Sequence, residues 1–321
     1  MEKSTIPTSN TAETPVPAVK SFLTVVYVLI VCSFIIIGTV GNVLVLLSVW
    51  FFSRLRNWAN ALIVNLSIAD LVVALVTMPT LLVRLFVDNL MENSPELCRL
   101  VFQVNLTVVL VSVTTLGISS INRYILITKP RYVYRQYCGR NNIVILLILI
   151  WVISLAIVFI PPIGLDLINY VPANQFCHFK EDSIIAWWYG SLLLLLYIGV
   201  VIGVIIVSSI LTFYKITSVR NRVQIVLERS QTSQDAPQRN TLTKQELLVT
   251  RMMLFVCLAF CFCMLPYCIN HALSYKVYHY PLFFKACILL ILTNSCINPL
   301  IYAGSNRFFR ASFKKILTFN L

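Results

Sequence analysis

Seven long uncharged runs restrict what this chain can fold into. Each run is longer than the ~18 residues that a helix needs to cross a bilayer. In hydrocarbon, a helix satisfies its own backbone hydrogen bonds, so each run is expected to be a helix. The sequence therefore predicts an all-α membrane protein with a seven-transmembrane helix bundle. The runs cover residues 22–52, 57–83 (interrupted only by Asp70), 100–122, 141–165, 183–214, 252–275 and 286–306.

The domain organisation follows from these runs and their polar ends. Residues 1–21, rich in Ser, Thr and Pro, are expected to form an N-terminal tail, and residues 22–304 a single membrane domain. In residues 305–321, aromatic residues recur at helical spacing opposite basic ones, which predicts a short amphipathic helix on the inner leaflet and a short tail. We expect the spans at about 22–52, 57–87, 97–127, 141–165, 183–216, 246–275 and 281–304.

The basic residues predict the orientation in the membrane. Of the 25 Lys and Arg residues, 18 lie in the loops after spans one, three and five, at the edges of those loops and in the C-terminal tail. Basic loops stay cytoplasmic. The N-terminus is therefore expected to be extracellular, as in a multi-pass plasma membrane protein. The net charge of +13 is explained by this topology and by attraction to membrane lipids, without a nucleic-acid partner.

Two of the ten cysteines lie on the oxidising side of the membrane. They are Cys98, at the start of span three, and Cys177, in the loop before span five. A single disulfide between them is the simplest interpretation. Four more cysteines crowd span six, where a metal site is the weaker alternative to packing. These are Cys257, Cys261, Cys263 and Cys268.

Polar residues inside the spans form a candidate cation site. Asp70 is the only acid within a span, and an ionisable group there costs about 2.5–3.5 kcal/mol on insertion scales. Carboxylate, hydroxyl and amide oxygens suit a hard cation such as Na⁺. The alternative is a buried hydrogen-bond cluster around a protonated Asp70. The other members of the candidate network are Asn42, Ser112, Asn294, Ser295 and Asn298.

Eight motifs in order give the chain a family resemblance. They are GNVLV around Asn42, NLSIAD ending at Asp70, Cys98, NRY at 122–124, Trp151, Cys177, CMLP at 263–266 and NPLIY at 298–302. Their order and spacing resemble those of the rhodopsin-like (class A) G-protein-coupled receptors over essentially the whole chain. The resemblance implies a receptor that activates a heterotrimeric G protein, an extracellular disulfide between the two cysteines, and a sodium ion in the Asp70 network.

The resemblance also implies roles at the cytoplasmic side. In NRY, formed by Asn122, Arg123 and Tyr124, the arginine matches the one that receives the G protein. Glu246 matches the acid that pairs with it at rest; otherwise the arginine reaches to lipid phosphate. Residues that match other parts of the activation machinery are Tyr214, Tyr302, Met264 and Pro266.

The chain departs from the family pattern at three positions. Asn122 stands where most of the family has an acid, and melatonin receptors also have asparagine there. The likeness to those receptors stops at that point, because they lack the Asn298-Pro299 pair. Ile206 replaces the usual proline of span five, and Met264 replaces the usual tryptophan of span six. The last two changes weaken the expectation of a standard activation relay.

The ligand pocket is expected between the extracellular halves of the helices. Asn105 stands where amine receptors carry an aspartate, so a monoamine ligand is not favoured. Leu292 stands where opsins carry the retinal-linking lysine, so covalently bound retinal is not favoured either. A mostly apolar pocket with cations at its rim, including Lys285, predicts a small lipophilic ligand with an anionic group. The cations alternatively anchor helices at the interface. Candidate contacts are Arg84, Gln103, Asn105, Tyr267, His271, Phe284 and Ile288.

The sequence thus predicts a cell-surface G-protein-coupled receptor. Nothing in it suggests an enzyme or a cofactor other than the sodium ion. Arrestin is a second candidate partner, through the loop between spans five and six. One alternative is a seven-helix decoy or scavenger receptor that binds ligand without coupling. Another, a transporter or channel, needs a continuous polar path, which Asp70 alone does not supply.

Overall fold

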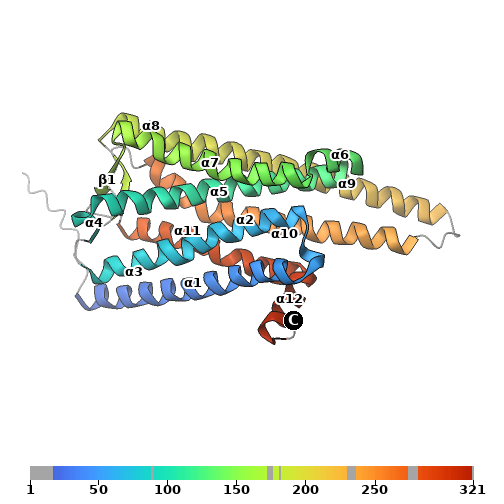
Figure 1. Ribbon diagram of the computed structural model, residues 1–321, viewed down its shortest axis with the longest axis horizontal. Helices are drawn as coiled ribbons and strands as arrows, with labels where there is room; N and C mark the ends of the chain where they lie inside the picture. The colour runs from blue at the N-terminus through green and yellow to red at the C-terminus, as the bar shows by residue number, and fades with distance from the viewer. Residues whose placement is uncertain are drawn as a thin grey trace, which may run out of the picture.

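The computed structural model describes residues 17–87, 90–171, 176–180, 182–229, 236–273 and 281–319. Within them, seven helical stretches are long and apolar enough to cross a membrane, as predicted. They lie side by side in one bundle (Figure 1). The spanning helices are α1 (Pro17–Phe51), α2 with α3 (Trp58–Val72, Met78–Phe86), α5 (Pro95–Thr128), α7 (Arg140–Leu165), α8 with α9 (Ile184–Ser191, Gly199–Arg229), α10 (Ala236–Leu273) and α11 (Pro281–Ser305).

Local sequence signals set several helix ends. Asn57 and Ser183 cap the first turns of α2 and α8 by accepting backbone N–H groups with their side chains. α5 begins at Pro95, whose missing N–H would be unpaired in a first turn anyway. α7 ends at Leu165 and is followed by Asp166, whose left-handed backbone (φ 44°) stops the helix.

Two spans contain short π-helical segments that the sequence did not predict. Val73–Thr77 joins α2 to α3, and Leu192–Ile198 joins α8 to α9. Such segments are rare and often lie at functional sites, because the extra residue rotates the side chains of the next turns. Span five therefore carries a helical irregularity although it has no proline.

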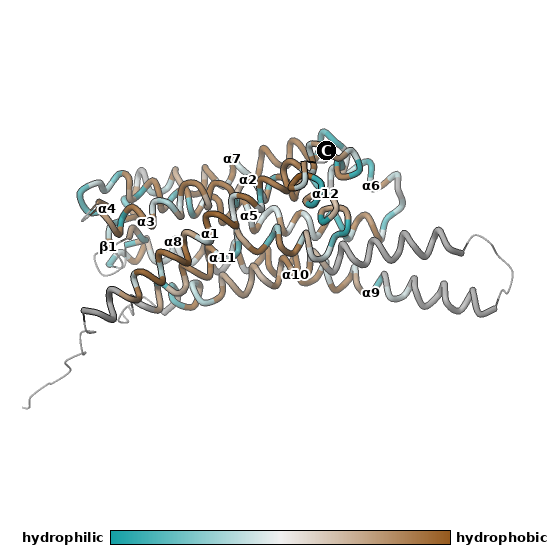
Figure 2. The backbone as a smooth tube through the Cα atoms, turned by 90° about the horizontal axis from the view of Figure 1, so that it is seen from below, coloured by the Kyte–Doolittle hydropathy of each residue, from teal (hydrophilic) through white to brown (hydrophobic). Residues whose placement is uncertain are grey.

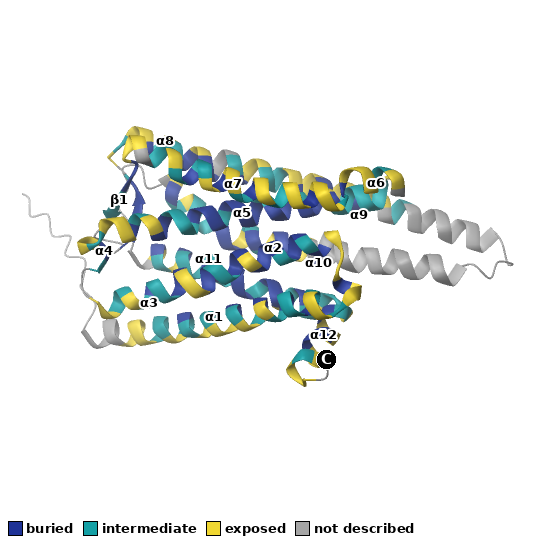
Figure 3. Ribbon diagram, viewed as in Figure 1, coloured by how far each residue is buried: buried dark blue, intermediate teal, exposed yellow. Residues whose placement is uncertain are grey.

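Apolar side chains cover both the inside and the outside of the bundle. The inward faces are buried, whereas the outer faces of α1 and α7 are largely exposed (Figure 3). Trp50 and Ile160, for example, are 73% and 66% exposed. Figure 2 shows apolar residues along the spans and polar ones toward the bundle's ends. A soluble protein would not expose so much apolar surface, so this outer face is suited to lipid.

Helix α1 packs closely on α11 because of a glycine. A Cβ atom at Gly41 would lie 2.9 Å from the ring of Pro299, so any larger residue would push the helices apart. The neighbouring Asn42 then donates to the backbone oxygens of Gly38 and Ser295, at 2.9 Å each. The close approach therefore positions one member of the polar network.

A β-hairpin covers one end of the bundle. Strands β1 (Ile168–Val171) and β2 (Phe176–Phe179) pair antiparallel, with Tyr170 opposite Cys177. The predicted disulfide joins Cys98 of α5 to Cys177. All four residues of β2 are buried. We refer to this end, which also contains the short helix α4 (Leu90–Asn93), as the hairpin end.

At the hairpin end, charged groups secure the chain around the disulfide. Arg99 pairs with Glu96 at 3.3 Å and with Asp166 at 3.2 Å, and Lys180 also pairs with Asp166. The hydrogen bond from Lys180, together with the nearby Arg99, holds the pKa of Asp166 below its usual range. These pairs connect α5, the end of α7 and the residue after β2.

The opposite end carries α6 (Arg131–Tyr137) and the predicted amphipathic helix α12 (Arg307–Leu317). Phe309 and Phe313 of α12 are buried against the bundle. The Phe309 ring lies 5.7 Å from that of Tyr302. Ser312 donates to the Ser48 hydroxyl at 2.9 Å. Part of the apolar face of α12 therefore packs against the helix bundle of the same chain.

We predict that Cys98→Ser and Cys177→Ser each lower surface expression or ligand binding. A disulfide is typically worth about 2–4 kcal/mol. Because the two sulfurs form one bond, the double variant should be little worse than either single one. Flow cytometry of tagged receptor measures this, with the free thiol variant Cys32→Ser as the control. Additive losses would mean that the two cysteines act independently.

Candidate functional site

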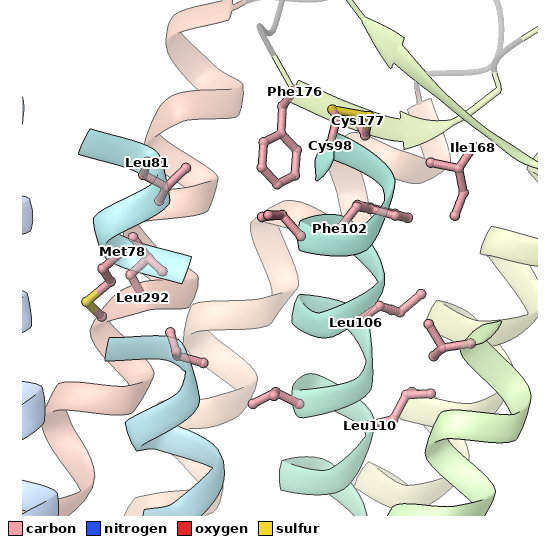
Figure 4. Close-up of a cluster of buried hydrophobic side chains, with 14 of the residues drawn as sticks. Met78, Leu81, Cys98, Phe102, Leu106, Leu110, Ile168, Phe176, Cys177 and Leu292 are labelled. Carbon is pink, nitrogen blue, oxygen red and sulfur yellow. A yellow bond between two sulfur atoms is a disulfide. The ribbon is translucent and has the colours of Figure 1, made fainter. Parts of the chain in front are cut away.

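An apolar cavity of about 80 Å³ lies beneath the hairpin. Figure 4 shows the ring of Phe176 between Leu81 and Phe102. The cavity is lined from five spans and from β2, so it exists only when the bundle and the hairpin are assembled. Its lining residues are Thr77, Leu81, Phe102, Asn105, Leu106, Val109, Phe176, Leu194, Met264, Tyr267, Ile288, Ile291 and Leu292.

Asn105 is the main polar group of this cavity. Its Oδ1 accepts a hydrogen bond from Thr77 at 2.7 Å, and its Nδ2 donates to the Val101 backbone at 2.8 Å. Thr77 is the last residue of the π-helical segment of span two. The Asn105 amide retains one N–H and one oxygen lone pair for a further partner.

Two histidines, one in strand β2 and one in α10, pack against each other beside the cavity's upper wall. His178 Nε2 is 2.9 Å from the Tyr267 hydroxyl, and its ring centroid lies 5.5 Å from that of His271. His271 Nε2 is 3.4 Å from Ser191 Oγ. A Cβ atom at Gly190 would lie 2.8 Å from the His271 ring, so this packing requires glycine.

The predicted ligand contacts do not all line the same cavity. Asn105, Tyr267 and Ile288 line the cavity. Gln103 instead lines an outer cavity of about 660 Å³ between α5 and α7, and its amide is 3.4 Å from the Val158 oxygen. Gln103 is therefore not expected to touch a ligand in the inner cavity.

The remaining predicted contacts lie above or beside the cavity. His271 and Phe284 are buried, and the Phe284 ring lies 6.4 Å from the rings of both His178 and Tyr267. The Arg84 guanidinium lies 5.5 Å from the centroid of Phe176. These side chains form the roof of the cavity.

A second, smaller cavity of about 30 Å³ lies deeper, beside Asp70. Ser112, Asn294 and Ser295 line it together with Asp70. Asn298 Nδ2 donates to Asp70 Oδ2 at 2.9 Å. All six predicted network residues are buried, and Asn42 joins the others through the Ser295 backbone oxygen. The structure therefore brings the predicted polar residues together.

The deeper cavity has oxygens suited to a cation. The Oδ1 atoms of Asn294 and Asn298 are buried and accept no hydrogen bond in the described part of the chain. A carboxylate and neighbouring amide and hydroxyl oxygens are ligands that Na⁺ accepts. The residues present therefore fit a sodium ion held mainly by Asp70.

The two cavities share part of their lining. Both are lined by Asn105, Val109, Met264, Ile291 and Leu292. Met264 is buried and takes the place where the family usually has tryptophan. Methionine is unbranched and flexible, so this wall can change shape more easily than a tryptophan wall. Only a thin layer of side chains thus separates the upper cavity from Asp70.

The residues of the NRY motif lie at the end opposite the hairpin. Asn122 is buried and Arg123 half-buried. Tyr134 of α6 faces both of them; burial and the nearby Cys138 raise its pKa, and Arg123 and Asn122 oppose that shift. The Glu246 side chain lies outside the described part of the chain, so its pairing with Arg123 stays a prediction.

The other predicted activation residues differ in exposure. Tyr302 is buried, whereas Tyr214 is 74% exposed and half-buried Tyr124 lies between these extremes. Pro266 lies inside α10 and Pro299 inside α11, where each removes a backbone hydrogen bond and favours a kink. Tyr214 would have to turn inward to approach Arg123.

Sequence reasoning missed several site residues. Thr77, Phe102 and Phe176 belong to the cavity, yet each resembles an ordinary apolar-span or loop residue. Asn65 accepts from Trp151 and donates to Thr115, at 2.9 Å and 2.8 Å. The motif around Asn65 does not reveal these partners. No signal in the sequence indicates such pairings between distant segments.

The four cysteines of span six differ in burial. No group of three or more His, Cys, Asp or Glu residues that could hold a metal ion occurs within the described ranges. Cys257 and Cys263 are buried, and Cys261 and Cys268 are partly buried. Cysteines buried in this way act as small apolar side chains that pack against their neighbours.

Comparison with known proteins agrees with this architecture. Melatonin receptor type 1C of Xenopus laevis is 28% identical over 288 residues, 88% of this chain and 65% of that receptor. Type 1A of Phodopus sungorus is 29% identical over 288 residues, 88% of this chain and 77% of that receptor. 5-Hydroxytryptamine receptor 2B of Dichotomyctere fluviatilis is 32% identical over 157 residues, 46% of this chain and 33% of that receptor.

The similarity to melatonin receptors is confirmed, and it extends far beyond the NRY motif, to 88% of the chain. The chain spans 65% to 77% of the length of these two melatonin receptors. The sequence profile described as 7 transmembrane receptor (rhodopsin family) matches residues 41–302. The chain therefore belongs to the rhodopsin family of seven-transmembrane receptors.

Proposed function

We propose that this receptor binds a small, mainly apolar extracellular ligand in the cavity beneath the hairpin and activates a heterotrimeric G protein. The observation that carries this proposal is the position of the cavity. It is roofed by the hairpin and lies directly above the Asp70 cavity. A ligand there would press on Met264 and α11, which are walls of both cavities.

The cavity chemistry supports an apolar ligand with few polar groups. Most lining side chains are aliphatic or aromatic, and Thr77, Asn105 and Tyr267 are the polar ones. Ligand sites in proteins usually measure about 300–1,000 Å³. The cavity of about 80 Å³ is smaller than this range. A ligand therefore either places only a thin group in it or separates the helices as it enters.

The same bundle would couple ligand binding to the cytoplasmic side. A sodium ion held by Asp70 and its neighbouring oxygens would favour the resting packing of α2, α5 and α11. Arg123, half-buried beside Tyr134, would receive the G protein once α10 moves. The N-terminus would be extracellular, α12 would contact lipid, and arrestin would bind through the loop between spans five and six.

Ligand-dependent nucleotide exchange tests the function. The purified receptor is mixed with a G protein, and exchange is followed while candidate ligands are added. Exchange that rises with ligand supports coupling. Ligand binding that produces no exchange with any G-protein class would instead support a decoy receptor, for which Met264 and the proline-free fifth span are the motivating features.

Asn105→Ala and Tyr267→Phe should weaken agonist potency. Losing one hydrogen bond to the ligand is worth about 0.5–1.5 kcal/mol, or roughly twofold to tenfold. Gln103→Ala is the matched control, because it lies two residues away on α5 but lines the other cavity. Dose–response curves at equal surface expression measure the shifts. A larger shift for Gln103→Ala than for Asn105→Ala would place the ligand outside the inner cavity.

Asp70→Asn should abolish the sodium dependence of agonist affinity. If the ion prefers the resting state, raising sodium lowers agonist affinity in the native receptor. Asparagine keeps the shape and removes the charge that holds the cation. Agonist competition binding in NaCl, with choline chloride at the same ionic strength as the control, measures this. A sodium effect that persists in Asp70→Asn would exclude Asp70 as the cation ligand.

Asn122→Asp should lower agonist-free signalling. An aspartate would attract Arg123 in the resting state, whereas asparagine offers only a neutral hydrogen bond. Arg123 is half-buried, so the pair would be partly solvated and worth about 0.2–1 kcal/mol, and basal activity should fall by up to about fivefold. Glu246→Ala should raise it. Basal exchange at matched expression is measured, with Asn122→Ala as the uncharged control. Unchanged or higher activity in Asn122→Asp contradicts the idea.

A further inference from the structure

Two cations lie directly above the apolar cavity, on different spans. Arg84 follows the cavity residue Leu81 by three positions on α3, and Lys285 precedes the cavity residue Ile288 by three positions on α11. Three residues advance a helix by about 4.5 Å and return nearly to the same face. Each cation therefore stands about one turn nearer the hairpin end than the cavity wall.

Arg84 points into the bundle rather than toward lipid. Its guanidinium lies 5.5 Å from the ring of Phe176, which lines the cavity. The hydroxyls of Tyr27 and Tyr170 are its electrostatic neighbours. Glu92, exposed on α4, acts electrostatically on Tyr170. This inward position argues against a role for Arg84 as a simple anchor at the membrane surface.

Lys285 lies in the first turns of α11, at the same end of the bundle, and carries the same charge. It is half-buried, and Arg84 is close enough to repel it. Repulsion between like charges is stronger in a partly buried site than in water. The ion pairs found in the described ranges involve Arg99 and Lys180, not Lys285. An anion placed near both cations would offset this repulsion.

We propose that Arg84 and Lys285 bind the anionic head group of a small amphiphilic ligand whose apolar part fills the cavity below. This inference rests on the proposed receptor function and names the chemical class of its ligand. A carboxylate or phosphate between the two cations forms charge-assisted hydrogen bonds, which are stronger than neutral ones. The hydroxyls of Tyr27 and Tyr170 supply further donors.

Phe176 connects the two halves of this site. One side of its ring faces the guanidinium of Arg84, and the residue also lines the cavity. It is fixed in the hairpin next to the disulfide-bonded Cys177. A ligand with its head at the cations would lay its apolar part along this ring, toward Asn105 and Met264.

Thermal unfolding of the purified receptor tests the proposal without requiring signalling. The probes are straight-chain alkyl carboxylates and alkyl phosphates of increasing length, each compared with the neutral alcohol of equal length. The receptor is held in nanodiscs of phosphatidylcholine, which supply no net anionic head group. A ligand that binds the folded state raises Tm with its concentration, so affinities can be compared. At the best chain length, an anionic probe should bind at least about tenfold more tightly than its alcohol.

Charge-neutral variants test which residues cause the preference for the anionic probe over the alcohol. Arg84→Gln and Lys285→Gln should each reduce the preference for the anion about tenfold, and Arg84→Lys should retain part of it. Arg99→Gln is the matched control, because Arg99 is a cation of the same end that pairs with Glu96 and Asp166 instead. Adding phosphatidylserine to the nanodiscs distinguishes a bilayer head group from a free ligand. If it competes with the probes, the bilayer can supply the anion.

Three results would overturn the proposal. These are equal binding of acid and alcohol, no binding of either anion at any length, and a preference that survives in the double variant Arg84→Gln with Lys285→Gln. G-protein exchange is measured in parallel to separate the two proposals. Anions that bind through these residues without exchange support the site and reject the signalling function. Exchange driven only by neutral ligands supports the function and rejects the site.

Discussion

The absence of water in the hydrocarbon core is the constraint on which this structure depends. Every backbone N–H and C=O group at that depth must be paired within the protein, so the spans are helical. The π-helical segments at Val73–Thr77 and Leu192–Ile198 keep this pairing while rotating the next turns of each span. In span two, the result is a threonine that reaches Asn105 on a neighbouring helix. A backbone irregularity thereby becomes part of a binding site.

The same constraint concentrates polar groups in a few places. Buried polar atoms need partners, and the helices supply them across their interfaces. Asn42, Asp70 and Asn298 hold α1, α2 and α11 together, and Asn65 with Trp151 links α2 to α7. The asparagine oxygens left over around Asp70 are where a cation fits. The same residues thus join the helices and, in the proposed function, hold the sodium ion that favours the resting state.

The hairpin gives the bundle its roof and the proposed ligand its two-part environment. β2 is held to α5 by the disulfide and contributes Phe176 to the cavity. The guanidinium of Arg84 lies over that ring, and aliphatic side chains line the cavity below it. The arrangement divides the site into a charged upper part and an apolar lower part. Met264 then forms a flexible wall between this site and the Asp70 cavity.

The sequence by itself determined the bundle, the amphipathic helix after it, the disulfide partners and the members of the polar network. Each of these follows from composition, from helical spacing or from a motif that is local in the chain. Tertiary structure alone decided which of two nearby α5 residues faces the cavity, Asn105 or Gln103. It also decided that Phe176 lines the cavity and that Arg84 lies over its ring. The rotation of a helix and the docking of a loop depend on contacts between distant segments. In a span that is apolar on all sides, the sequence does not show which face of the helix points inward.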